Sequence, residues 1–168
     1  MSQAKNHLRW CINKAKAEIQ KGEKQRGIVE SSPDIKMAKS YIKKAEHNLE
    51  VFLYNKEGNY FDWVINIGFY VFYHCFLAVL SKFGYESRNQ ECTFSAIEFL
   101  IEEKKIESKF KEYIDFMKSG FDKEEDSLLP LREFYQYTPS IEVEQLKVER
   151  LENMCKSVLR DTKTIIES

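Results

Sequence analysis

The sequence predicts an all-α fold, an up-and-down bundle of about four main helices with short extra helices. Six Gly and three Pro among 168 residues are less than half of the roughly 12% that these helix breakers reach in an average chain. Hydrophobic residues make up 43% and charged residues of both signs 32%, which excludes a wholly disordered chain and is typical of solvent-facing helices around a core. Apolar residues recur at helical spacing, and no alternating strand pattern of useful length occurs.

The first predicted helix covers residues 4–21, where apolar positions recur at three- and four-residue steps among Lys and Arg. These positions are Leu8, Ile12, Ala15 and Ile19. Gly22 and Gly27 bracket a basic connector, and residues 28–31 are expected to form a turn or a short extended link.

The next two predicted helices form the centre of the bundle. The helix over 32–56 is expected to begin with Ser32 as its N-cap and Pro33 at its first position, and Gly58 ends it. Its apolar stripe consists of Ile35, Ala38, Ile42, Ala45, Leu49 and Phe52. The helix over 60–82 is dense in aromatic residues and apolar almost all round, so we expect it to be the most buried element. Polar residues interrupt it, which favours a core helix over a membrane span.

Four further helices complete the prediction. Two short ones are expected over 94–105 and 107–118, and a third over 124–137, which Pro130 should kink or restart. The last runs over 140–167, and its buried face is expected to contain Ile141, Leu146, Leu151, Met154, Val158 and Ile165. Short connections predict antiparallel neighbours.

We expect a single domain over 1–168, with an N-terminal helix and basic connector at 1–27 and a core bundle at 28–168. The net charge is −1, which gives no global attraction to nucleic acid or to membranes. The first 56 residues nevertheless carry 12 Lys and Arg against 6 Asp and Glu, and the other 112 carry 14 against 21. The basic half is either two solvated helix faces or a surface that faces a polyanion or an acidic partner.

The cysteines show neither a CxxC motif nor zinc-ligand spacing. No apolar segment of a secretory signal occurs in the first 30 residues. We therefore expect a cytoplasmic protein whose cysteines are free thiols that act as small hydrophobic residues. They are Cys11, Cys75, Cys92 and Cys155.

Motifs for several kinds of catalysis are missing from the sequence. It contains no glycine-rich phosphate loop, no HExxH, no nucleophile elbow and no EF-hand loop. None of the three histidines follows a Glu by three residues, which excludes a di-metal carboxylate bundle. We expect no cofactor and no metal site.

Two segments, 69–76 and 131–137, place hydroxyl groups, an imidazole and a guanidinium among aromatic residues. Such groups either satisfy one another across a helix interface or bind a ligand. Gly68 directly precedes the first segment and Pro130 lies two residues before Arg132. A close helix approach at the glycine and a kink at the proline would bring the two segments together.

Three stretches resemble the HEPN family of small helical-bundle proteins. Residues 38–49 resemble its opening helix, with Ala, Tyr, Ile, Ala and Leu at the family's spacing. Residues 58–61 and 69–80 resemble its second helix, with Val and Tyr where the family usually has Ala and Phe. Residues 131–140 resemble its late arginine motif and the tyrosine before the final helix. The likeness covers about residues 28–168 and rests on the order and spacing of the motifs.

The chain departs from the family's ribonucleases at one position. Those metal-independent enzymes share an Arg-x(4–6)-His motif, in which the histidine is the general acid/base and the arginine holds the scissile phosphate. Arg132 is present, but no histidine follows His74, and Tyr137 stands five positions after the arginine. Tyrosine, with a pKa near 10, is a poor base at neutral pH. The resemblance therefore implies a non-enzymatic member.

We expect a helical domain that binds a nucleotide, a nucleic acid or a partner protein. The resemblance implies a homodimer and, as a possible partner, a minimal nucleotidyltransferase in a toxin–antitoxin-like pair. The arginine fork would contact phosphate, the rings would stack on a base or donate hydrogen bonds, and lysines would add positive field. The expected ligand-binding residues are Arg132, Tyr137, Tyr73, His74, Lys43 and Lys44. Two alternatives are an endoribonuclease toxin with a replaced base and a pure protein-interaction module.

Overall fold

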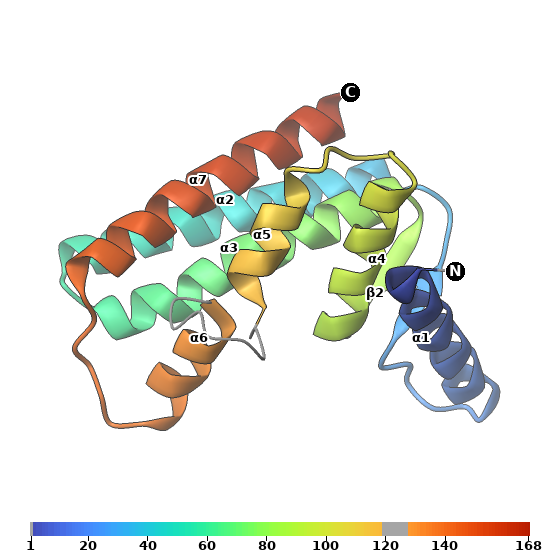
Figure 1. The fold of residues 1–168 in the computed structure, drawn as a ribbon, viewed down its shortest axis with the longest axis horizontal. Helices are drawn as coiled ribbons and strands as arrows, with labels where there is room; N and C mark the ends of the chain where they lie inside the picture. Colours follow the sequence, from blue (N-terminus) through green and yellow to red (C-terminus); the bar gives the residue numbers. More distant parts are fainter. Residues whose placement is uncertain (1, 119–127) are drawn as a thin grey trace.

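A computed structural model describes residues 2–118 and 128–168 of the chain (Figure 1). The described residues form seven helices and one two-stranded sheet, so the all-α prediction is confirmed with a small sheet added. In chain order the elements are α1 (Gln3–Gln20), β1 (Ile28–Glu30), α2 (Ile35–Glu57), α3 (Phe61–Lys82), β2 (Tyr85–Ser87), α4 (Gln90–Glu102), α5 (Phe110–Met117), α6 (Leu128–Tyr137) and α7 (Gln145–Glu167).

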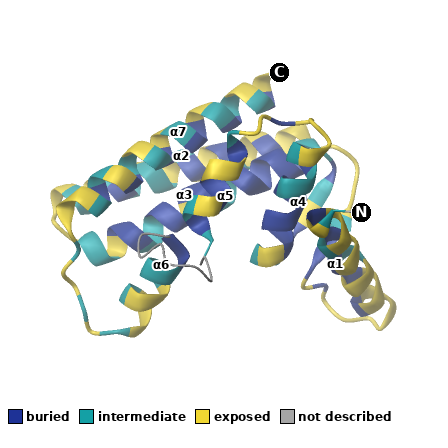
Figure 2. Ribbon diagram, viewed as in Figure 1, coloured by how far each residue is buried: buried dark blue, intermediate teal, exposed yellow. Residues whose placement is uncertain are grey.

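Three long helices, α2, α3 and α7, lie side by side and form the centre of the fold (Figure 1). The helix α3 packs against both of the others and also against α4, α5 and α6. It is the most extensively buried helix, as its all-round apolar sequence predicts (Figure 2). Among the described residues it is also the one helix whose length and composition would allow a membrane span, and most of that stretch is buried against other helices.

The N-terminal helix α1 lies outside this three-helix centre and packs against α4 and β1 (Figure 1). The strand β1 follows the basic connector and pairs antiparallel with β2, with Ile28 opposite Ser87 and Glu30 opposite Tyr85. The extended link predicted at 28–31 is therefore confirmed. The strand β2 was not predicted, because three residues are too few to show an alternating pattern.

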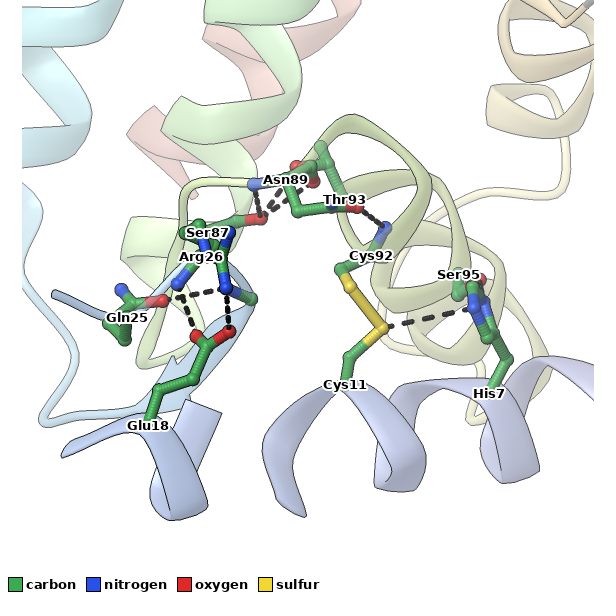
Figure 3. Close-up of a disulfide and its surroundings, with 11 residues drawn as sticks. His7, Cys11, Glu18, Gln25, Arg26, Ser87, Asn89, Cys92, Thr93 and Ser95 are labelled. Atoms are coloured by element: carbon green, nitrogen blue, oxygen red, sulfur yellow. Dashed lines mark hydrogen bonds and ion pairs between the residues drawn. A yellow bond between two sulfur atoms is a disulfide. The ribbon is translucent and has the colours of Figure 1, made fainter. Parts of the chain in front are cut away.

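A disulfide between Cys11 and Cys92 joins α1 to α4 (Figure 3). The expectation of four free thiols is therefore wrong for this pair, and it holds for Cys75 and Cys155, which are free and buried. The pairing joins residues 81 positions apart whose Cα atoms lie within 5.9 Å. Such a pairing depends on how α1 docks on α4, and no local sequence spacing reveals it.

Two helices begin at caps that differ from the prediction. The N-cap of α2 is Asp34 rather than Ser32, because its Oδ1 accepts a hydrogen bond from the backbone N–H of Met37 at 2.8 Å. The helix α4 begins four residues earlier than predicted, since the side chain of Asn89 accepts from the backbone N–H of Cys92 at 2.9 Å. Asp34 lies one residue, and Asn89 five residues, before the first apolar position of its predicted helix, so the apolar pattern does not mark the cap.

The segment from α6 to α7 differs most from the prediction. Pro130 is the third residue of the described part of α6, and the residues before it that would show the predicted kink or restart are not described. Residues 124–127 of the predicted helix lie outside the described residues. The helix α7 begins five residues later than predicted, and Ile141 and Leu146 are 70% and 76% exposed rather than buried.

A close approach of α3 and α7 at Gly68 is confirmed. A Cβ atom on this glycine would lie 2.7 Å from Cδ2 and 3.0 Å from Cγ of Leu151. The thiol of Cys155 lies 3.8 Å from the carbonyl oxygen of Gly68, on the same side of α7. The absence of a side chain therefore lets α7 pack against the turn of α3 that precedes the Phe69–His74 segment.

Candidate functional site

Arg132 on α6 lies over two aromatic rings of α3. Its Cζ atom is 4.4 Å from the ring centroid of Phe69 and 5.7 Å from that of Tyr70, which is cation–π geometry. Its Nε is buried without a hydrogen-bond partner, and no carboxylate in residues 2–118 and 128–168 forms an ion pair with it. Among the described residues, this positive charge is held in place by aromatic contacts and not by an acidic side chain.

A row of aromatic rings continues from these contacts toward α2. Phe69 stacks on Tyr73 with centroids 5.9 Å apart, and the rings of Tyr70 and Tyr73 lie 6.2 and 6.3 Å from that of His74. Tyr41 of α2 also stacks on His74, with ring centroids 6.0 Å apart. We call these five residues the aromatic row. It connects α6 to α2 across the middle of α3.

The imidazole of His74 is oriented by its own helix. In the tautomer with a proton on Nδ1, that nitrogen donates to the carbonyl oxygen of Tyr70 at 2.7 Å. The side-chain amide of Asn48 lies 3.0 Å from the same nitrogen. Burial lowers the pKa of His74, and the charge of Lys44 lowers it further against the effect of the Tyr70 hydrogen bond. The ring is therefore neutral at pH 7, and Arg132 supplies the positive charge of this cluster.

The hydroxyls of Tyr73 and Tyr41 are neutral as well. Burial raises the pKa of Tyr73 and of Tyr41, although the Thr93 hydroxyl acts in the opposite direction on Tyr73. The tyrosine at 70 is 42% exposed, so part of the row faces solvent. The cluster combines one fixed cation with neutral hydrogen-bonding groups and flat apolar surface, the set of groups that binds nucleotide phosphates and bases.

The structure brings together three of the six residues predicted to bind a ligand. Arg132, Tyr73 and His74 are connected through Phe69 and Tyr70. The latter two were quoted in the sequence motif but not chosen as site residues. Phe69 lies four residues before Tyr73, and Tyr70 four residues before His74, so each pair shares one helix face. This spacing could have identified Phe69 and Tyr70 as site residues from the sequence.

The other three predicted residues lie apart from the connected cluster. Tyr137 is 78% exposed at the end of α6, and five residues of helix turn it well away from the face that carries Arg132. Lys43 and Lys44 are exposed on α2, and Lys44 alone influences His74 through its charge.

The end of α2, the start of α3, α6 and the start of α7 lie at the opposite end of the molecule from α1 (Figure 1). Several of the large exposed apolar side chains belong to these elements and to the link before α7. We call them together the aromatic end; they are Tyr54, Tyr60, Trp63, Phe134, Tyr137, Ile141 and Leu146. Exposed aromatic groups in such number are typical of protein–protein contacts.

A comparison of the chain with protein-family models finds no match, and neither do comparisons with curated proteins and with solved structures. The fold and the cluster define an all-α protein with a cation–aromatic site. Its function is inferred from that geometry.

Proposed function

We propose that this chain is a non-enzymatic, HEPN-like binding domain whose Arg132 site takes a phosphate group of a nucleotide or of RNA. The supporting observation is the guanidinium held over Phe69 and Tyr70 without an acidic partner among the described residues. A guanidinium fork matches phosphate oxygens in pairs and stays charged at every physiological pH. Positioning it in advance reduces the entropy lost on binding.

The aromatic row supplies the second half of the proposed site. A base that stacks on an exposed ring such as Tyr70 would lie beside the phosphate contact, and neutral Tyr and His side chains would donate or accept hydrogen bonds at its edge. Lys44 on α2 adds positive field at His74. These groups recognise a nucleotide as a class and do not select one base.

We expect wild-type protein to bind ATP, GTP or a short RNA, and Arg132→Ala to weaken that binding about ten- to hundredfold. The expected loss follows from one charge-assisted hydrogen bond, about 1.5–3 kcal/mol. Fluorescence or calorimetric titration measures it. Arg160→Ala is the matched control, because it removes the same charge from an exposed position on α7. Equal affinities of the two variants, or no binding by wild type, contradict the proposal.

The endoribonuclease alternative would use the same cluster. It needs a general acid/base beside the arginine, and His74, neutral at pH 7, is the candidate within the cluster. The same proteins, incubated with total RNA without added metal, distinguish the two functions. Intact RNA at high protein concentration supports the binding domain, whereas cleavage that Arg132→Ala abolishes shows an enzyme.

We further propose that the aromatic end associates with a second copy of the chain, or else with a partner such as a minimal nucleotidyltransferase. Trp63 and Phe134 are 61% and 49% exposed there. We expect light scattering to give a dimer at micromolar concentration and Trp63→Glu to give a monomer, because a charge placed in an apolar contact loses its hydration. Trp10→Glu, at a position on α1 that is 53% exposed, should leave the mass unchanged. A wild-type monomer, or a dimer that persists in Trp63→Glu, excludes self-association through this surface.

A further inference from the structure

We propose that reduction of the Cys11–Cys92 disulfide converts this pair, together with His7, into a binding site for a zinc ion. The three side chains meet where α1 docks on α4 (Figure 3). Both sulfur atoms belong to buried residues, and Nε2 of His7 lies 4.0 Å from Sγ of Cys11. Thiolate and imidazole are the ligands that zinc prefers.

The spacing of His7 and Cys11 is close to that of two ligands of a tetrahedral zinc ion, and the two sulfurs are free to move apart once their bond is broken. With zinc–sulfur and zinc–nitrogen bonds of about 2.3 and 2.0–2.1 Å, a sulfur and a nitrogen ligand of one ion lie about 3.6 Å apart. The observed 4.0 Å between His7 and Cys11 is close to that separation. His7 and Cys11 are four residues apart on α1 and so share one helix face. Cys92 reaches the same point from α4.

The His7 ring is already oriented as a ligand. Its Nδ1 lies 2.6 Å from the hydroxyl oxygen of Ser95, so that a proton on Nδ1 makes a hydrogen bond there. The tautomer with that proton leaves the lone pair of Nε2 facing the sulfur of Cys11 (Figure 3). Ligating histidines commonly donate their second N–H to such a polar group, which fixes the ring and the tautomer.

The proposed switch is a two-electron exchange. In the disulfide form the sulfurs are bonded to each other, and no set of His, Cys, Asp or Glu in the described residues is arranged to hold a metal ion. A dithiol reductant gives up two electrons and two protons and becomes a disulfide, while the Cys11–Cys92 bond breaks to two thiols. Zinc then displaces both thiol protons into solvent, and the two thiolates neutralise its charge. Oxidation by a disulfide reverses these steps and releases the ion.

An adjoining cavity of about 610 Å³ gives the ion a route to solvent. Both His7 and Ser95 line it, and so do three carboxylates and two ammonium groups, namely those of Glu91, Glu98, Glu102, Lys111 and Lys118. One of these ammonium groups, that of Lys118, is paired with Glu98. Three protein ligands leave a fourth zinc position, which water from this cavity would occupy.

Cobalt(II) is the probe for this site, because cobalt bound to thiolates absorbs light through sulfur-to-metal charge transfer. We expect the dithiol-reduced full chain, freed of reductant, to bind one cobalt ion with charge-transfer and tetrahedral d–d bands, and zinc to displace it. The oxidised chain should show neither band. Ser95→Ala should weaken zinc binding about ten- to hundredfold, as losses of such supporting hydrogen bonds do.

Variants assign the ligands. Cys11→Ser and Cys92→Ser should each remove the charge-transfer bands, and His7→Ala should shift the d–d bands and weaken binding. Cys75→Ser, which changes a free thiol buried in α3, should leave the spectrum unchanged. The proposal is wrong if reduced wild type shows no charge-transfer band, or if the bands persist in Cys11→Ser or disappear in Cys75→Ser protein that remains folded by circular dichroism.

Discussion

Phe72→Ala should lower the free energy of unfolding by about 3–5 kcal/mol, the usual cost of removing a buried phenylalanine ring. Phe72 is fully buried on α3, and its ring lies 6.1 Å from Tyr113 and 5.5 Å from Phe116. It therefore fills the space between α3 and α5, and truncation leaves a cavity that fixed helices cannot close.

Chemical denaturation and thermal melting measure the effect of Phe72→Ala. In a domain of this size, each kcal/mol of lost stability lowers the melting temperature by about 2–4 °C. The matched control is Phe134→Ala, in which the same ring is removed from a position that is 49% exposed. Measured at a protein concentration at which the chain is monomeric, because Phe134 belongs to the surface proposed for self-association, it should change stability by no more than about 0.5 kcal/mol. Similar losses in both variants would show that Phe72 does not fill the core as described.

Loss of the Cys11–Cys92 disulfide should lower the free energy of unfolding by about 2–4 kcal/mol, because an unlinked unfolded chain gains entropy. The bond closes a long loop, since its cysteines are 81 positions apart. Apart from this bond, α4 and β1 are the described elements against which α1 packs substantially. We therefore expect the double variant Cys11→Ser/Cys92→Ser to lose protection from hydrogen exchange first in α1, while α3 remains protected.

A chelator in the buffer keeps metal binding from compensating for the lost bond in reduced wild type. With the chelator present, wild type whose disulfide has been reduced should unfold at a similar denaturant concentration to the double variant measured without reductant. Adding dithiol to the double variant should change nothing. If reduction leaves wild-type stability and the exchange of α1 unchanged, the disulfide does not hold α1 to the bundle.

The candidate site was predictable in part. Arg132, Tyr73 and His74 were chosen because they lie among aromatic residues in the two segments that resemble the family's functional positions, and the structure connects them. Tyr137 was chosen by counting positions along a motif, and the turn of α6 carries it to another face. Linear spacing shows which residues share a helix face, but it does not show which helix lies opposite.

The helical class and the central place of α3 could be predicted from the sequence alone, because helical periodicity and breakers act over a few neighbouring residues. The folded molecule was needed to find the disulfide, the α7 partner of Gly68, the contact of Arg132 with Phe69 and the exposure of Ile141 and Leu146. Each of these depends on how helices distant in the chain dock on one another. Docking is set by the shapes of whole helix faces, which no single stretch of sequence contains.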